Sequence, residues 1–276
     1  MPSLRIKDAT IAYTDAGRGD ETVLLFHGSA SSRRMWQPLV ERLAGRYRVV
    51  APDLVGYGES TPWHAGLQAT DDDVVATFAR ELGCPLHVVG HSYGGALALR
   101  AALAADSRVT SLVLVEPAAF KVLDRVADRA AFAEIEAVAS RHLELVAAGD
   151  LDACAAHFMG YWIGPATWAG MSPETRARLT ATMPKIASEF RLLFRDRDTY
   201  DPRRARVPTL LVRAAHTTAA ARAVIDRLAA TMPSVELLEI ADAGHMVPVT
   251  HAARVNAAIE TRLAQVEAEA IFDAAA

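Results

Sequence analysis

The stretch 89-VGHSYGG-95 decides the fold of this chain. It follows a short apolar run, residues 85–89, and precedes an Ala- and Leu-rich segment, residues 96–105. A buried strand must therefore turn sharply into a helix at Ser92. Such a turn strains the backbone of the serine, and the glycines on either side let strand and helix pass close together. The stretch predicts a serine hydroxyl that projects into the open at the end of a central strand.

The composition of the 276-residue chain indicates one large α/β domain with room for an insertion, because 51% of the residues are hydrophobic and 22% are charged. A formal net charge of −4 gives no field of one sign that would attract nucleic acid or an anionic membrane. The N-terminus lacks the pattern of a signal peptide, and no apolar run is long enough for a membrane span. Cys84 and Cys154 form no disulfide or metal-binding pattern. We expect a cytoplasmic protein without a metal or cofactor, of open oligomeric state.

The spacing of apolar residues predicts repeated β-α units. Continuous apolar runs, typical of strands buried in a parallel sheet, occur at 22–26, 47–51, 86–89, 111–115 and 209–212. Helical patterns occur at 35–44, 70–82, 94–105 and 218–232, and a last strand is expected at 235–240. Alternation over 4–17, closed by a turn at 17–20, predicts an antiparallel opening strand. The expected fold class is α/β, a mostly parallel central sheet flanked by helices.

Residues 117–205 interrupt this rhythm, because they contain helical patterns and no run typical of a buried strand. A helix is expected over 124–148, another after Ser172, and Pro184 should kink or divide the helical pattern after it. We therefore expect an all-helical cap, or lid, over 117–205, and a core formed by 1–116 and 206–276. The aromatic-rich cap is well placed to line a substrate pocket. Its candidate pocket residues are His157, Tyr161, Trp162 and Trp168.

Four motifs in the same order resemble those of the α/β-hydrolase fold superfamily. They are LLFHGSASSRRMW (24–36), VVAPDLVGYGES (49–60), GHSYGG (90–95) and IADAGHMVPVTH (240–251), and the likeness covers nearly the whole chain. The first resembles the family's His-Gly loop, the second its Asp-x-x-Gly-x-Gly-x-Ser turn, the third its nucleophile elbow and the fourth its histidine segment. The resemblance implies the α/β-hydrolase fold and says much less about the substrate.

Within this resemblance, Ser92 matches the nucleophile and His245 the general base that removes its proton. The backbone N–H groups of Tyr93 and Ser29 are the expected oxyanion hole, which holds negative charge on the substrate oxygen. We expect His27 and His91 to order the loops in which they lie.

The acid of the triad departs from the common pattern of the family. Most relatives carry an Asp after the strand that matches 209–212, whereas this chain has no carboxylate over 213–218. Glu116 ends the strand after the nucleophile helix, where some branches of the superfamily place their acid, and is our candidate. Asp242, or a threonine at 217 or 218 acting through water, is the alternative.

The expected function is a cofactor-free serine hydrolase that cleaves a small-molecule ester or lactone through an acyl-enzyme. A serine at the elbow argues against the dehalogenase-like and epoxide-hydrolase-like branches, which use an aspartate there. Cleavage of a carbon–carbon bond in a diketone-type substrate by the same triad stays open, as does a peroxide-using or acyl-transfer enzyme. A catalytically weak ligand-binding module of the same fold is a further alternative, because the usual Asp is absent.

Overall fold

One eight-stranded sheet runs through the molecule, in the order β1-β2-β4-β3-β5-β6-β7-β8. The computed structural model describes residues 2–83, 85–104, 107–194 and 200–275, so Cys84 lies outside the described part. Only the pairs β1–β2 and β2–β4 are antiparallel, and the other neighbours are parallel. The strands are β1 Ser3–Ile6, β2 Ala9–Ala16, β3 Thr22–Phe26, β4 Arg48–Pro52, β5 Leu86–His91, β6 Val109–Val115, β7 Thr209–Ala214 and β8 Val235–Ile240.

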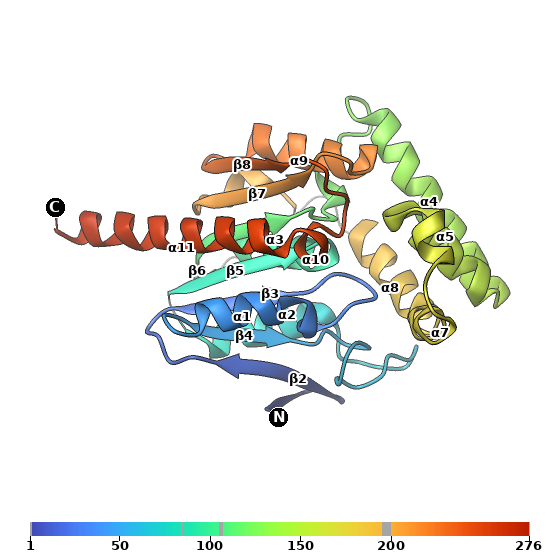
Figure 1. Cartoon of the computed structure of the whole chain (residues 1–276), viewed down its shortest axis with the longest axis horizontal. Helices are drawn as coiled ribbons and strands as arrows, with labels where there is room; N and C mark the ends of the chain where they lie inside the picture. Colours follow the sequence, from blue (N-terminus) through green and yellow to red (C-terminus); the bar gives the residue numbers. More distant parts are fainter. Residues whose placement is uncertain (1, 84, 105–106, 195–199, 276) are drawn as a thin grey trace.

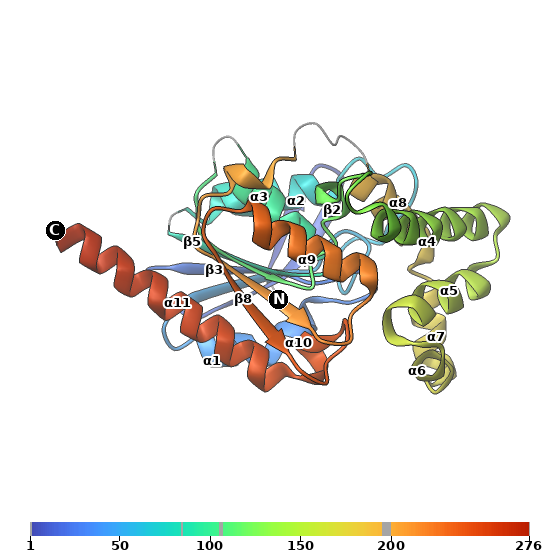
Figure 2. The same cartoon turned by 90° about the horizontal axis from the view of Figure 1, so that it is seen from above.

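Helices cover both faces of the sheet, which confirms the predicted α/β class (Figure 2). On one face lie α1 (Gln37–Leu43), the short α10 (Val247–Thr250) and α11 (Ala252–Ala275); on the other lie α2 (Asp71–Glu81), α3 (Tyr93–Leu103) and α9 (Ala219–Thr231). Two clusters of buried apolar side chains result, one containing Leu97 and Val224 and the other Leu39 and Ile259. None of the helices in the described segments has the length and apolar character that crossing a membrane requires.

The cap segment, residues 117–205, joins β6 to β7. Its described residues form helices and no strand: η2 Phe120–Val122, α4 Arg129–Ala148, α5 Leu151–Ile163, α6 Pro165–Ala169, α7 Pro173–Thr180, α8 Met183–Phe194 and η4 Pro202–Arg204. Helices α4 to α8 gather at one end of the sheet, and α11 extends past the opposite end (Figure 1). The cap segment therefore lies at the edge where β3, β5 and β6 end.

The register of the parallel strands brings four chain segments together at that edge. Phe26 pairs with Gly90, His91 pairs with Val115, and Val115 pairs with Val212. The loop after β3, Ser92 after β5, Glu116 after β6 and the loop after β7 are consequently neighbours. Ligand sites of open α/β sheets form at such carboxyl ends of strands.

The structure differs from the predicted elements in three places. The opening segment is a hairpin of β1 and β2, because Lys7 at φ 52° turns the chain between them. Helix α4 begins at Arg129 rather than at Asp124, since the Asp124 carboxylate accepts the backbone N–H groups of Val126 and Ala127 and forms a turn. No element is predicted from the sequence after residue 240, where α10 and α11 lie.

The contact between α3 and β3 depends on a helix residue without a side chain. A Cβ on Gly94 would lie 2.4 Å from the carbonyl oxygen of His27 and 2.5 Å from that of Phe26. Gly94→Ala should therefore lower the free energy of unfolding by about 1–3 kcal/mol. The matched control is Gly160→Ala on α5, where no atom beyond the adjoining residues and the backbone of its own helix lies within 4 Å of the new Cβ. There we expect a gain of about 0.5–1 kcal/mol. Urea unfolding measures both, and equal effects would contradict the assigned contact.

Candidate active site

Ser92 stands at the turn from β5 into α3 with φ 53° and ψ −119°, a conformation that costs a non-glycine residue about 1–3 kcal/mol. The turn is held by its surroundings: the Ser92 N–H donates to the carbonyl of Val115 at 3.0 Å, and its own carbonyl accepts from Ala118 at 2.9 Å. A Cβ on Gly90 would lie 2.2 Å from the carbonyl oxygen of Gly94, so only glycine fits there. The strained turn predicted from the sequence is present.

His245 lies in the loop between β8 and α10 and contacts Ser92. Its Nε2 is 2.9 Å from the Ser92 Oγ, and its Nδ1 is 3.1 Å from Oε2 of Glu116. In this arrangement Nδ1–H donates to the carboxylate, and Nε2 accepts from the serine hydroxyl. Ser92, His245 and Glu116 thus form one chain of hydrogen bonds.

Glu116 has no solvent-exposed surface, and its backbone has φ 48°. Its Oε1 accepts the backbone N–H of Ala214 at 2.7 Å, and its Oε2 accepts the Thr217 hydroxyl as well as the His245 N–H. A buried carboxylate is costly unless such donors surround it. The end of β7 and the loop after it, which carries no carboxylate of its own, therefore supply donors to the carboxylate that follows β6.

The alternative acids lie elsewhere. The Asp242 side chain is 93% exposed, and its carboxylate is 4.0 Å from His216, whereas His245 faces Glu116. Thr218 is the N-cap of α9, where its hydroxyl accepts the N–H of Ala221. Thr217 reaches Glu116, not the imidazole. Of the candidates, only Glu116 contacts His245.

The loop after β3 lies against Ser92. A Cβ on Gly28 would be 3.2 Å from the Ser92 Cβ and 2.8 Å from His91 Nδ1, which places the Gly28–Ser29 backbone beside the serine. Ser29 and Ser92 line the same cavities. Both residues expected to form the oxyanion hole, Ser29 and Tyr93, are thus immediate neighbours of Ser92 in space or in sequence.

Two cavities meet at Ser92, and we name them by their position relative to His245. The outer pocket, of about 220 Å³, is lined by His245 and Met246, and by Met171 and Leu179 of the cap segment. The inner pocket, of about 20 Å³, lies toward α8. Its cap residues include Ile186, Glu189, Phe190 and Leu193.

Of the four predicted pocket residues of the cap segment, Trp162 lines both cavities. Its ring stacks on that of His245 with centroids 4.1 Å apart. The other three have structural contacts and do not line either pocket: His157 bonds to the carbonyl of Val138, Tyr161 donates to Glu134, and Trp168 is buried in the core. The aromatic side chains led to the prediction of a pocket in the cap segment. Which of them reaches the cavity depends on the helix face on which each one lies.

Comparison with known proteins identifies the family. Residues 21–252 match the family model described as the alpha/beta hydrolase fold. The chain belongs to this family. A solved structure of a hydrolase from Pseudomonas aeruginosa superposes with a TM-score of 0.75 at 26% identity, covering 95% of this chain and 97% of that one. The resemblance inferred from the four sequence motifs is therefore confirmed.

Two curated relatives match shorter segments of this α/β-hydrolase. The dihydrolipoyllysine-residue acetyltransferase component of the acetoin cleaving system of Cupriavidus necator is 43% identical over 112 residues, 40% of this chain and 30% of that protein. The pimeloyl-(acyl-carrier protein) methyl ester esterase of Aliivibrio salmonicida is 40% identical over 107 residues, 38% of this chain and 39% of that protein. The matched segments thus span less than two fifths of the length of these relatives.

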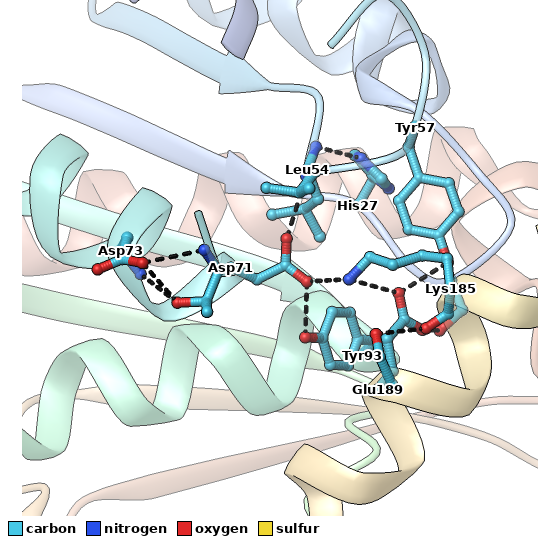
Figure 3. A network of polar contacts seen from close by, with 12 residues as sticks. His27, Leu54, Tyr57, Asp71, Asp73, Tyr93, Lys185 and Glu189 are labelled. Atoms are coloured by element: carbon cyan, nitrogen blue, oxygen red, sulfur yellow. Dashed lines mark hydrogen bonds and ion pairs between the residues drawn. The ribbon is translucent and has the colours of Figure 1, made fainter. Parts of the chain in front are cut away.

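A buried ionic network, which the sequence analysis missed, joins the cap segment of the α/β-hydrolase to its core (Figure 3). Lys185 of α8 lies 2.5 Å from Asp71 at the start of α2 and 3.5 Å from Glu189, one helical turn away. The Tyr57 hydroxyl donates to Glu189, and the Tyr93 hydroxyl donates to Asp71. The signal was present as a Lys and a Glu four residues apart in the largely apolar helix 183–194.

Glu189 also contacts the loop beside Ser92, because it accepts the Ser29 hydroxyl at 2.5 Å. Burial raises the pKa of the Glu189 carboxyl. Burial alone would lower the pKa of the Lys185 ammonium, but the carboxylates of Asp71 and Glu189 outweigh it and raise that pKa. The network therefore links the side chains of both residues expected in the oxyanion hole, Ser29 and Tyr93, to helix α8.

Two buried histidines hold the loops around the site, as predicted. The His27 Nε2 accepts the N–H of Leu54 at 3.0 Å, and the His91 Nε2–H donates to the carbonyl of His245 at 2.9 Å. Burial lowers the pKa of His27 to about 4 and that of His91 to about 3. Among the described residues, no group of three or more His, Cys, Asp or Glu side chains is arranged to hold a metal ion.

Lys185→Met should destabilise the protein by about 3 kcal/mol or more, because it leaves two buried carboxylates without their shared cation. The matched control is Arg191→Met, which removes an exposed cation from the same helix and should change stability by less than about 0.5 kcal/mol. Urea unfolding at pH 7 provides both values. A Lys185→Met variant as stable as Arg191→Met would contradict a stabilising role for the network.

His91 should make the protein less stable as the pH falls from 6.5 toward 3. Over this interval the His91 imidazole is protonated in the unfolded chain but stays neutral in the folded one. Between pH 7 and pH 5 this amounts to about 2 kcal/mol. In His91→Gln, the loss of unfolding free energy over that interval should be smaller by this amount. Urea unfolding of both proteins at the two pH values measures the difference, and equal losses would rule out the assignment.

Proposed function

We propose that this α/β-hydrolase is a serine esterase that works through an acyl-enzyme. One observation carries the proposal: Ser92, His245 and Glu116 are joined by hydrogen bonds of 2.9 and 3.1 Å at the floor of a cavity. A serine hydroxyl is a poor nucleophile near neutral pH, and a base with an oriented second nitrogen is what it requires. The name of the Aliivibrio relative, an ester-cleaving enzyme, agrees with this reaction.

In the first half-reaction, the Ser92 oxygen bonds to the ester carbonyl carbon while its proton passes to Nε2 of His245. Glu116 holds the other ring nitrogen and stabilises the imidazolium that forms. The carbonyl oxygen becomes negative and accepts hydrogen bonds from the backbone N–H groups of Ser29 and Tyr93. The bond to the alcohol oxygen then breaks, and His245 returns the proton to that oxygen.

In the second half-reaction, water replaces the alcohol. His245 takes a proton from the water, whose oxygen bonds to the acyl carbon, and Ser92 leaves with the proton from the imidazolium. The products are one acid and one alcohol, and no cofactor takes part. Trp162, stacked on the His245 ring, excludes water from one face of the imidazolium and presents it with a π-face.

Glu116 is proposed as the acid although most relatives carry an aspartate after the strand that matches β7. Its carboxylate touches His245, and the donors from Ala214 and Thr217 hold it in that orientation. A carboxylate in contact with the imidazole argues against the alternative of a binding module without turnover. Cleavage of a carbon–carbon bond by the same triad is distinguished from ester cleavage by assaying a diketone-type substrate beside an ester.

Ser92→Ala should abolish hydrolysis of 4-nitrophenyl acetate, and Glu116→Gln should lower kcat by about 10³–10⁴-fold. Asp242→Asn, which changes an exposed carboxylate of the same loop as His245, should leave kcat within about twofold of wild type. Stopped-flow release of nitrophenol gives the rates. Equal losses in Glu116→Gln and Asp242→Asn would overturn the assignment of the acid.

Moving the carboxylate provides a stricter test of the same assignment. Thr217 donates its hydroxyl to the carboxylate that contacts His245, so an aspartate at 217 extends from the neighbouring loop toward the imidazole. We expect Glu116→Ala with Thr217→Asp to recover at least about tenfold of the kcat lost in Glu116→Ala alone. Recovery with Thr217→Asn in place of Thr217→Asp would show that the charge is not what the site needs.

A further inference from the structure

We propose that the enzyme prefers esters with a short acyl group, acetyl above all, and a larger alcohol portion. This inference rests on the proposed esterase function and names its substrate class. It is carried by the unequal sizes of the two cavities that meet at Ser92, about 20 Å³ for the inner pocket and about 220 Å³ for the outer pocket.

The position of His245 decides which part of the ester enters which cavity. Its Nε2 must return the proton to the alcohol oxygen, so the alcohol portion has to lie on the side of the imidazole. His245 and the adjoining Met246 line the outer pocket, and neither lines the inner one. The alcohol portion therefore occupies the outer pocket, and the acyl chain points from Ser92 into the inner pocket.

The volume of the inner pocket limits the acyl chain. About 10–15 Å³ is the space that one water molecule requires, and a methyl group is of similar size. A pocket of about 20 Å³ therefore accepts the methyl group of an acetyl ester, whereas a butanoyl or octanoyl chain must displace its walls. Forcing extra methylene groups into a packed interior is unfavourable, because it distorts side chains and backbone.

The walls of the inner pocket are themselves fixed. Phe120 and Ile186 are 1% exposed and Phe190 is 3% exposed, so they are packed from behind. Glu189, also in this wall, is tied to Lys185, Tyr57 and Ser29 by the buried network of Figure 3. The outer pocket has mostly apolar walls, with Met171 and Leu179 contributed by the cap segment, which suits a hydrocarbon alcohol portion.

The test varies the two parts of the ester separately. In a series of 4-nitrophenyl esters, kcat/KM should fall by at least about tenfold from acetate to butanoate and further to octanoate. In a series of acetates, kcat/KM should rise by about tenfold or more from methyl acetate to octyl acetate. A spectrophotometer monitors the first series, and titration of the released acid monitors the second.

Two leucines of equal burial, each 8% exposed, provide matched variants. Leu193→Ala enlarges the inner pocket and should bring the acetate-to-butanoate ratio of kcat/KM down by about tenfold. Leu179→Ala enlarges the outer pocket and should leave that ratio at the wild-type value.

The outcomes separate the inference from the proposed function. Wild-type hydrolysis that favours octanoate over acetate, or equal changes of the acyl ratio in both leucine variants, would overturn the inference and leave the esterase intact. A folded wild type that hydrolyses none of these esters, acetates included, would overturn the proposed function and the inference together.

Discussion

The buried carboxylate of Glu116 is the constraint on which the rest of the site depends. A carboxylate without solvent contact is tolerated only where donors replace the lost water. Three donors do so here: the N–H of Ala214, the hydroxyl of Thr217 and the imidazole of His245. Because these come from the end of β7 and from the loops after β7 and β8, the carboxylate at the end of β6 fixes the conformation of both loops. The hydrogen bonds from Glu116 to His245 and from His245 to Ser92 follow from the burial of the Glu116 carboxylate, which requires the imidazole as a donor.

Local motifs made much of the site predictable, because the residues that form a turn and the residue that the turn exposes are neighbours in the sequence. Ser92 and His245 lie in short motifs, and the strained turn at Ser92 is required by its glycines. Glu116 could be chosen only from its place at a strand end. Lys185 and Glu189 were missed because a Lys and a Glu one turn apart on a helix usually face solvent, and their burial shows only once Asp71 and Tyr57 are placed opposite them. Likewise, alternation over 4–17 did not reveal that Lys7 reverses the chain.

The buried network explains how helix α8 of the cap segment is held over the edge of the sheet that carries Ser92. Apolar packing alone would set the distance between the cap segment and the core but would allow the helices to slide along the core surface, because such contacts are not directional. Lys185 lies between Asp71 of the core and Glu189 of its own helix. The two ion pairs fix the rotation of α8 about its axis and its position along the core. Breaking the pair leaves uncompensated charge, so the alternative positions of α8 are unfavourable.

Helix α8 thereby connects the architecture of the cap segment with the chemistry at Ser92. Its residues Ile186, Phe190 and Leu193 form a wall of the inner pocket, while Lys185 and Glu189 anchor the same turns to the core. A wall held by ion pairs moves only at a high energetic cost, so it does not make room for a longer acyl chain. The outer pocket is bordered by Met171, in the loop before α7, and by Leu179 of α7. No ion pair is among the described contacts of these two residues. The buried charges therefore lie on the side of the smaller cavity, and the same charges hold the Ser29 loop beside Ser92.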